Sequence, residues 1–182
     1  CIVNAAMISS AGISRGSLKY LADTGRLDQV SRGVYTLPEV WEDEFVSIQE
    51  RYKRGVFALD TALFLHDLTD RTPHKFHMAF PYGYNTSSPK AAGILCSCKK
   101  EPYYSLGIAL VDTPAGNTVR AYNAEKTLCE ILKPISHTDI QIITDAFKRY
   151  AGRKDKNIPL LSEYAHQLRV EKRLRPYLEV LL

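Results

Sequence analysis

The sequence predicts an α+β protein, in which an N-terminal winged helix-turn-helix precedes an α+β domain with a mixed sheet and C-terminal helices. Two observations support this class. In residues 1–38 the apolar residues change from helical spacing to short strands joined by a turn containing glycine. In residues 39–182, short β-branched and aromatic runs give way to longer segments with helical spacing. We therefore predict two domains with these bounds.

The first domain begins with two predicted helices. Residues 3–11 read as a short helix, and Ser14 is a suitable N-cap for a second helix over residues 15–24. Leu18 and Leu21 share one face of that second helix at helical spacing. Because the chain begins inside an element and without Met, we expect the helix that usually precedes a helix-turn-helix to be missing.

A hairpin follows these helices. Residues 27–30 and 34–37 are strand-like, and the turn between them contains Gly33, which can adopt a positive φ. A helix-turn-helix followed directly by a hairpin is typical of a winged helix. Pro38 and the acidic residues after it mark the predicted domain boundary.

The second domain is predicted to contain helices, then strands, then helices again. The first two helices are expected over residues 42–54 and, capped by Asp60, up to about residue 66. Residues 82–89 are predicted as a loop that is either a recognition surface or a plain turn. The predicted strands are residues 74–81, 94–99, 108–112 and 117–122, and the predicted C-terminal helices are residues 124–132, 139–150, 159–168 and 170–181.

Composition excludes several classes. The 182 residues are 45% hydrophobic and 24% charged, as in globular proteins. Apolar runs are far shorter than the roughly 20 residues that a membrane helix needs, so we expect no membrane partner. Four scattered cysteines fit the reducing cytoplasm, where we place the protein. The net charge of +4 does not by itself imply nucleic-acid binding.

Basic residues on the second predicted helix and at the hairpin tip suggest a DNA-binding surface. In a helix-turn-helix the second helix enters the major groove, and a wing can reach phosphate or the minor groove. The alternative is a set of solvated charges on a winged helix that binds protein. The candidate DNA-binding residues are Arg15, Ser17, Lys19, Tyr20 and Arg32.

A second basic surface is predicted at the C-terminus. From residue 148 onward the sequence has nine basic residues and only four acidic ones. These cations are expected opposite the apolar Phe147 and Leu174. They can be solvated charges, a docking surface for an acidic partner, or contacts to DNA phosphates. The candidate partner residues are Lys148, Arg149, Lys172 and Arg173.

Enzymatic chemistry has weaker support. His66, Asp67, Asp70, His74 and His77 include metal-ligand types, but they lie across a helix end, a loop and a strand. The common signatures of phosphate-binding loops, acyl transfer and metalloproteases are absent from the sequence. We therefore predict no catalytic residue, no metal and no cofactor.

Several stretches together resemble the AbiEi antitoxins of type IV toxin-antitoxin systems, along essentially the whole chain. Their order and spacing are more specific than any one of them. The stretches are residues 11–15 with Leu18 and Leu21, and then residues 32–38, 61–69, 80–86 and 118–129.

The resemblance implies that the N-terminal domain binds inverted repeats in operator DNA and represses its own operon. It also implies that the C-terminal domain opposes an AbiEii-like nucleotidyltransferase toxin in phage defence by abortive infection. This opposition need not involve a stable complex with the toxin. The resemblance assigns a role to five residues only, all of them in DNA contact: Arg15, Ser17, Lys19, Tyr20 and Arg32.

Two other functions stay open. One is a nucleic-acid-processing enzyme, although Asp112 stands alone and Glu125 and Lys126 are adjacent rather than spaced as in nucleases. The other is a stand-alone winged-helix transcription factor with a ligand pocket.

Overall fold

The computed structural model describes residues 2–4, 15–24, 26–31, 34–36 and 43–181. The chain divides into two compact units, Cys1–Lys53 and Arg54–Leu182. The predicted domain boundary after residue 38 falls among residues 37–42, outside the described residues, and stays a prediction.

The described residues of the first unit form a small antiparallel sheet and two helices. The sheet has the strand order β1-β3-β2, with an irregularity in the pairing of β2 between Gln29 and Ser31. Its elements are β1 (Ile2–Asn4), α2 (Arg15–Asp23), β2 (Asp28–Ser31), β3 (Val34–Thr36) and α3 (Glu44–Arg51).

The helix predicted over residues 3–11 is wrong at its start. Val3 pairs with Tyr35 and Asn4 pairs with Val34, so this end of the segment is a strand. Backbone pairing with β3 overrides the local helical spacing, and the β-branched Val3 suits a strand. Residues 5–11 lie outside the described residues.

The core of the first unit joins α2 to the hairpin. Leu27 and Tyr35 are buried, and Leu21 and Ala22 of α2 pack against them. The face of α2 that holds Leu21 is therefore its inner face, as its spacing predicted.

The second unit is built on a mixed sheet with the strand order β6-β5-β4-β8-β7. β4 pairs in parallel with β8, and β5 in parallel with β6, whereas β4–β5 and β7–β8 are antiparallel. The α+β class with a mixed sheet and several helices is thus confirmed. The strands are β4 (Val56–Phe57), β5 (His77–Pro81), β6 (Leu95–Lys99), β7 (Ile108–Asp112) and β8 (Thr118–Tyr122).

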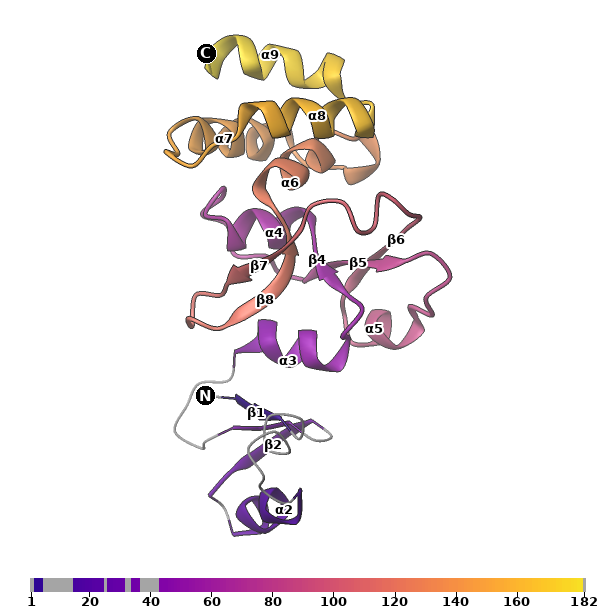
Figure 1. The fold of residues 1–182 in the computed structure, drawn as a ribbon, viewed down its shortest axis with the longest axis vertical. Helices are drawn as coiled ribbons and strands as arrows, with labels where there is room; N and C mark the ends of the chain where they lie inside the picture. The colour runs from indigo at the N-terminus through magenta and orange to yellow at the C-terminus, as the bar shows by residue number, and fades with distance from the viewer. Residues whose placement is uncertain (1, 5–14, 25, 32–33, 37–42, 182) are drawn as a thin grey trace. The chain divides into compact units, whose positions relative to one another are not determined.

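Helices cover this sheet. α4 and α6 to α9 lie together on one side of it, whereas α5 lies beside β6 (Figure 1). The helices are α4 (Leu59–Leu65), α5 (Ser87–Ala91), α6 (Ala124–Ile131), the 3-10 helix η1 (Pro134–Ser136), α7 (Ile140–Ala151), α8 (Ile158–Leu168) and α9 (Glu171–Leu181).

Several details differ from the sequence prediction. Ala58, not Asp60, is the N-cap residue of α4, and Asp60 lies in its first turn. The predicted loop 82–89 contains the start of α5, because parallel β5 and β6 require a crossover of a dozen or more residues. β4 was not predicted, since two residues are too few to show strand alternation.

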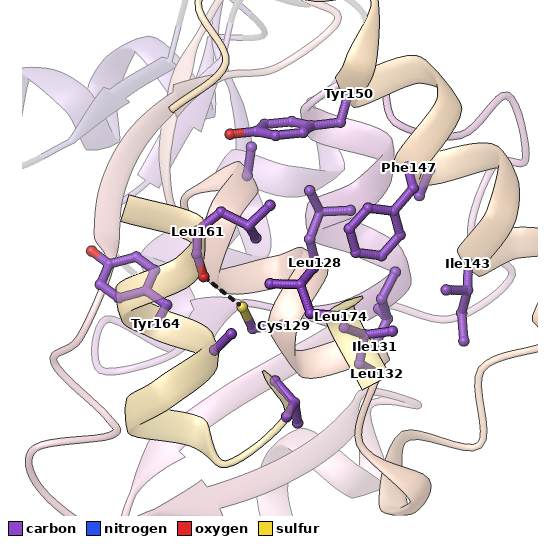
Figure 2. Packing of buried hydrophobic residues seen from close by; sticks show 14 of the residues in the cluster. Leu128, Cys129, Ile131, Leu132, Ile143, Phe147, Tyr150, Leu161, Tyr164 and Leu174 are labelled. Atoms are coloured by element: carbon purple, nitrogen blue, oxygen red, sulfur yellow. Dashed lines mark hydrogen bonds between the residues drawn. The ribbon is translucent and has the colours of Figure 1, made fainter. Parts of the chain in front are cut away.

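Helix α6 is the centre of the second unit, and all eight of its residues are buried. It packs against α4, α7 and α8. Figure 2 shows Leu128 and Cys129 of α6 among side chains from the neighbouring helices. The Cys129 thiol donates to the carbonyl oxygen of Leu161 at 3.6 Å, and burial raises its pKa to about 12. This cysteine is therefore a core residue rather than a nucleophile.

A buried tyrosine links three helical segments. The Tyr150 hydroxyl on α7 donates to Glu125 Oε1 on α6 at 2.8 Å and accepts from the Asn157 backbone N–H at 2.8 Å. Asn157 is the N-cap of α8, and its side chain accepts from the Leu160 N–H. Because Glu125 is 8% exposed, few water molecules can replace the hydroxyl.

We predict that Tyr150→Phe lowers the free energy of unfolding by about 1 to 3 kcal/mol, because it leaves a buried carboxylate and a backbone N–H without their partner. Urea unfolding followed by circular dichroism measures this loss. Tyr82→Phe is the matched control, since Tyr82 is 69% exposed and should change stability by less than about 0.5 kcal/mol. Equal effects of the two substitutions would contradict the role of Tyr150.

Candidate functional site

Four of the five candidate DNA-binding residues lie on α2. Lys19 and Tyr20 are exposed, Tyr20 by 68%, and Ser17 is half-buried. Arg15 is the first residue of the helix and precedes Lys19 by about one turn. Arg32 is outside the described residues.

The environment of α2 suits a helix that presents one face to a ligand. Leu21 and Ala22 hold its inner face on the core of the first unit. Its C-terminal end is closed by Thr24, whose hydroxyl donates to the Tyr20 carbonyl oxygen at 2.8 Å. The exposed side thus presents a cation and a phenol from a helix that is anchored at its other face. Such groups bind phosphate oxygens and base edges.

The four candidate partner residues are exposed and lie on two helices of the second unit. Lys148 and Arg149 are in the last turn of α7, and Lys172 and Arg173 are in the first turn of α9. The neighbouring apolar residues of these helices are buried, namely Phe147 and Leu174.

The two arginines of this group also have structural contacts. Arg149 Nη2 lies 3.4 Å from Asp70 Oδ2, in an exposed ion pair. Arg173 Nη1 donates to the Leu132 carbonyl oxygen at 3.1 Å, at the C-terminal end of α6. A change at Arg173 therefore removes a cap of α6 as well as a surface charge.

The histidines of the second unit have separate surroundings. His66 Nε2 lies 2.7 Å from the Tyr122 carbonyl oxygen, whereas His77 Nδ1 lies 3.8 Å from Asp60 Oδ2. Burial lowers the pKa of both histidines, which favours their neutral forms. His74 is exposed. Within the ranges that the structure describes, no three potential ligands are grouped so as to hold a metal ion.

A cluster of buried charges, not predicted from the sequence, surrounds α6. Glu130, which is 2% exposed, forms salt bridges through Oε1 with Lys99 of β6 and, at 3.4 Å, with Lys126. Lys126 is fully buried and also donates to the Tyr103 carbonyl oxygen at 2.9 Å. Both ammonium groups lie over the Tyr122 ring, about 5 Å from its centroid.

The environment of this cluster shifts its acid–base properties. Burial lowers the pKa of Lys126 to about 8, with Glu130 opposing and Lys99 adding to the change. Burial also raises the pKa of Tyr122 far above its usual value, and the Glu130 charge adds to the rise. The i, i+4 spacing of Lys126 and Glu130 was the available sequence signal, but the same spacing is common on solvated helix faces.

Comparison with known proteins finds a family match for the N-terminal segment and a solved structure with a similar fold. Residues 2–38 match the family model described as transcriptional regulator, AbiEi antitoxin. No curated protein matches the chain. The crystal structure of the RV2827C protein from Mycobacterium tuberculosis is similar, with a TM-score of 0.51 and 14% identity over 98% of this chain and 75% of that one.

In the described part of the chain, no helix has the length and apolar character needed to cross a bilayer. The mycobacterial structure shares the fold with this chain. The N-terminal segment, residues 2–38, is similar to a family of antitoxin transcriptional regulators, which is not a family of enzymes.

Proposed function

We propose that this protein is a cytoplasmic type IV antitoxin that represses its own operon by binding DNA and neutralises a nucleotidyltransferase toxin. One observation carries the proposal: α2 presents the exposed Lys19 and Tyr20 within the segment that matches the AbiEi antitoxin regulators.

The proposed DNA contact is that of a winged helix-turn-helix. α2 is the recognition helix, and the hairpin of β2 and β3 is the wing, with Arg32 at its tip. Arg15 and Lys19 contact phosphates and thereby fix the register of the helix, whereas Ser17 and Tyr20 reach base edges or the backbone. An inverted repeat in the operator offers two half-sites, which two copies of the chain occupy.

The proposed antitoxin surface is the basic surface formed by Lys148, Arg149, Lys172 and Arg173. Their exposure supports recognition of an acidic partner through electrostatic complementarity, which acts mainly on association rate and specificity. This recognition does not require a long-lived complex with the toxin.

We predict that Lys19→Ala weakens operator binding and lowers the slope of log affinity against log salt by about one, since each phosphate contact releases about one counterion. Arg15→Ala and Arg32→Ala are expected to behave alike. The measurement is a mobility-shift titration on the DNA upstream of the gene at several salt concentrations.

Lys53→Ala is the control for this titration, because Lys53 is an exposed lysine of the same unit outside α2 and the hairpin. Its salt slope should equal that of the unchanged protein. If Lys19→Ala and Lys53→Ala give the same slope, α2 does not contact phosphate as proposed.

We predict that Lys148→Glu combined with Lys172→Glu reduces neutralisation of the toxin without unfolding the protein. Adding Arg149→Glu and Arg173→Glu is expected to abolish neutralisation, but Arg173→Glu also removes the hydrogen bond to Leu132. The lysine pair is therefore the cleaner test. Neutralisation is measured as growth rescue on co-expression with the neighbouring nucleotidyltransferase gene, and folding by circular dichroism.

The control makes the same charge change outside the basic surface, with Lys53→Glu and Lys90→Glu. Both of these lysines are exposed, and the control is expected to preserve rescue. The competing reading places the antitoxin chemistry at the histidines. Loss of rescue in His66→Ala or His77→Ala, with full rescue by the lysine pair, would overturn the proposed surface.

A further inference from the structure

A cavity of about 420 Å³ lies beside the buried charge cluster of the second unit. Its wall combines the end of β6 with the segment after it, the end of α6 and η1. Lys99, Lys133 and Glu130 give it charge, Tyr103 and Ser136 give it hydroxyls, and Ile135 gives it an apolar side. Its volume falls in the range of small-molecule sites.

Positive charge exceeds negative charge around this cavity. The cavity lining holds the lysines Lys99, Lys100 and Lys133 and one carboxylate, that of Glu130. The Glu130 Oε1 already forms salt bridges with Lys99 and with the buried Lys126. The Lys133 ammonium forms no salt bridge with any residue that the structure describes, and it lies 6.0 Å from the centroid of the Tyr103 ring. A bound anion would balance this excess where water is partly excluded.

The second independent feature is an unused acceptor. Glu130 lines the cavity and is 2% exposed, and its Oε2 is buried without a hydrogen-bond partner among the described residues. A buried carboxylate oxygen without a donor is costly, and such groups in native proteins call for an explanation. A ligand with a hydroxyl or amino group would supply the donor once a small shift of the Glu130 side chain exposes this oxygen to the cavity.

A neighbouring cavity gives the ligand room beyond its anionic group. It measures about 740 Å³, shares Leu59, Ser97, Cys98, Ile135 and Ser136 with the first, and adds Lys75 and Lys90. Leu59, on the shared wall, has a φ of 48°, which is rare for a residue with a side chain. Strained backbone of this kind often accompanies binding sites.

We propose that this cavity binds a small phosphorylated molecule with hydroxyl or amino donors, the class of sugar phosphates and nucleoside monophosphates. Lys133 and Lys99 bind the phosphate, and Glu130 accepts a hydrogen bond from the donor. Ile135 and the Tyr103 ring pack against the carbon skeleton. This site shares no residue with the DNA-binding and antitoxin surfaces proposed above.

Calorimetric titration of the full chain with ribose 5-phosphate and with each of the four nucleoside monophosphates tests the proposal. Ribose and inorganic phosphate are titrated as the two halves of the ligand. At least one phosphorylated compound should bind more tightly than either half. Lys133→Gln should weaken that binding about tenfold or more, as expected for loss of a charged contact, whereas Lys154→Gln should not change it.

Glu130→Gln tests whether the site recognises the hydroxyl or amino group of the ligand in addition to its negative charge. Removing its negative charge should strengthen binding of inorganic phosphate while weakening the preference for the compound with hydroxyls. If this variant melts early, the comparison of Lys133→Gln with Lys154→Gln still decides, because the Lys133 ammonium has no salt bridge to lose among the described residues.

Three results would overturn the proposal. The first is that none of the phosphorylated compounds binds. The second is equal binding by the unchanged protein and Lys133→Gln. The third is Lys133-dependent binding of an eight-residue oligothymidylate without binding of any monophosphate, which would make the two cavities a groove for single-stranded nucleic acid.

Discussion

The second unit depends on keeping three charged residues inside one helix. Glu125, Lys126 and Glu130 are all at most 8% exposed, although an isolated charge in a protein interior is very unfavourable. Each is therefore compensated by a partner from another segment. The partners are Tyr150 for Glu125, the Tyr103 carbonyl for Lys126 and Lys99 for Glu130.

These partners explain how α6 orders its surroundings. Lys99 belongs to the edge strand β6, Tyr103 to the segment after it, and Tyr150 to α7. The charges of α6 therefore fix the sheet edge and the helical layer with respect to one helix. Polar contacts of this kind are directional, so they select one arrangement where apolar packing alone tolerates several.

Most elements of this fold were predictable because their signal is local. The helices α7 and α8 each have one buried face, and the spacing of Ile143 and Phe147 on α7 reveals it. The strands β7 and β8 stand out as short runs rich in β-branched residues, bounded by turn residues. The α+β class follows from this order of strands and helices along the chain.

The charge cluster and the cavity were not predictable, because their partners are far apart in sequence. Lys99 and Glu130 are 31 residues apart, and Glu125 and Tyr150 are 25 apart. In the sequence, the charges of α6 look like a solvated face. Similarly, the pairing of Phe57 with Ala121 depends on a two-residue strand and a long crossover, which leave no periodic pattern.

Exposed lysines and the buried charges of α6 respond differently to substitution. Lys19, Lys148 and Lys172 are exposed, so their replacement changes the field that a partner meets at little cost in stability. Removing Lys126 instead leaves Glu130 with one fewer cation inside the protein, and breaking a buried pair in this way is strongly destabilising. The proposed recognition by the exposed lysines can therefore change independently of the fold. The proposed cavity beside α6 instead shares Lys99 and Glu130 with the charge cluster that holds the second unit together.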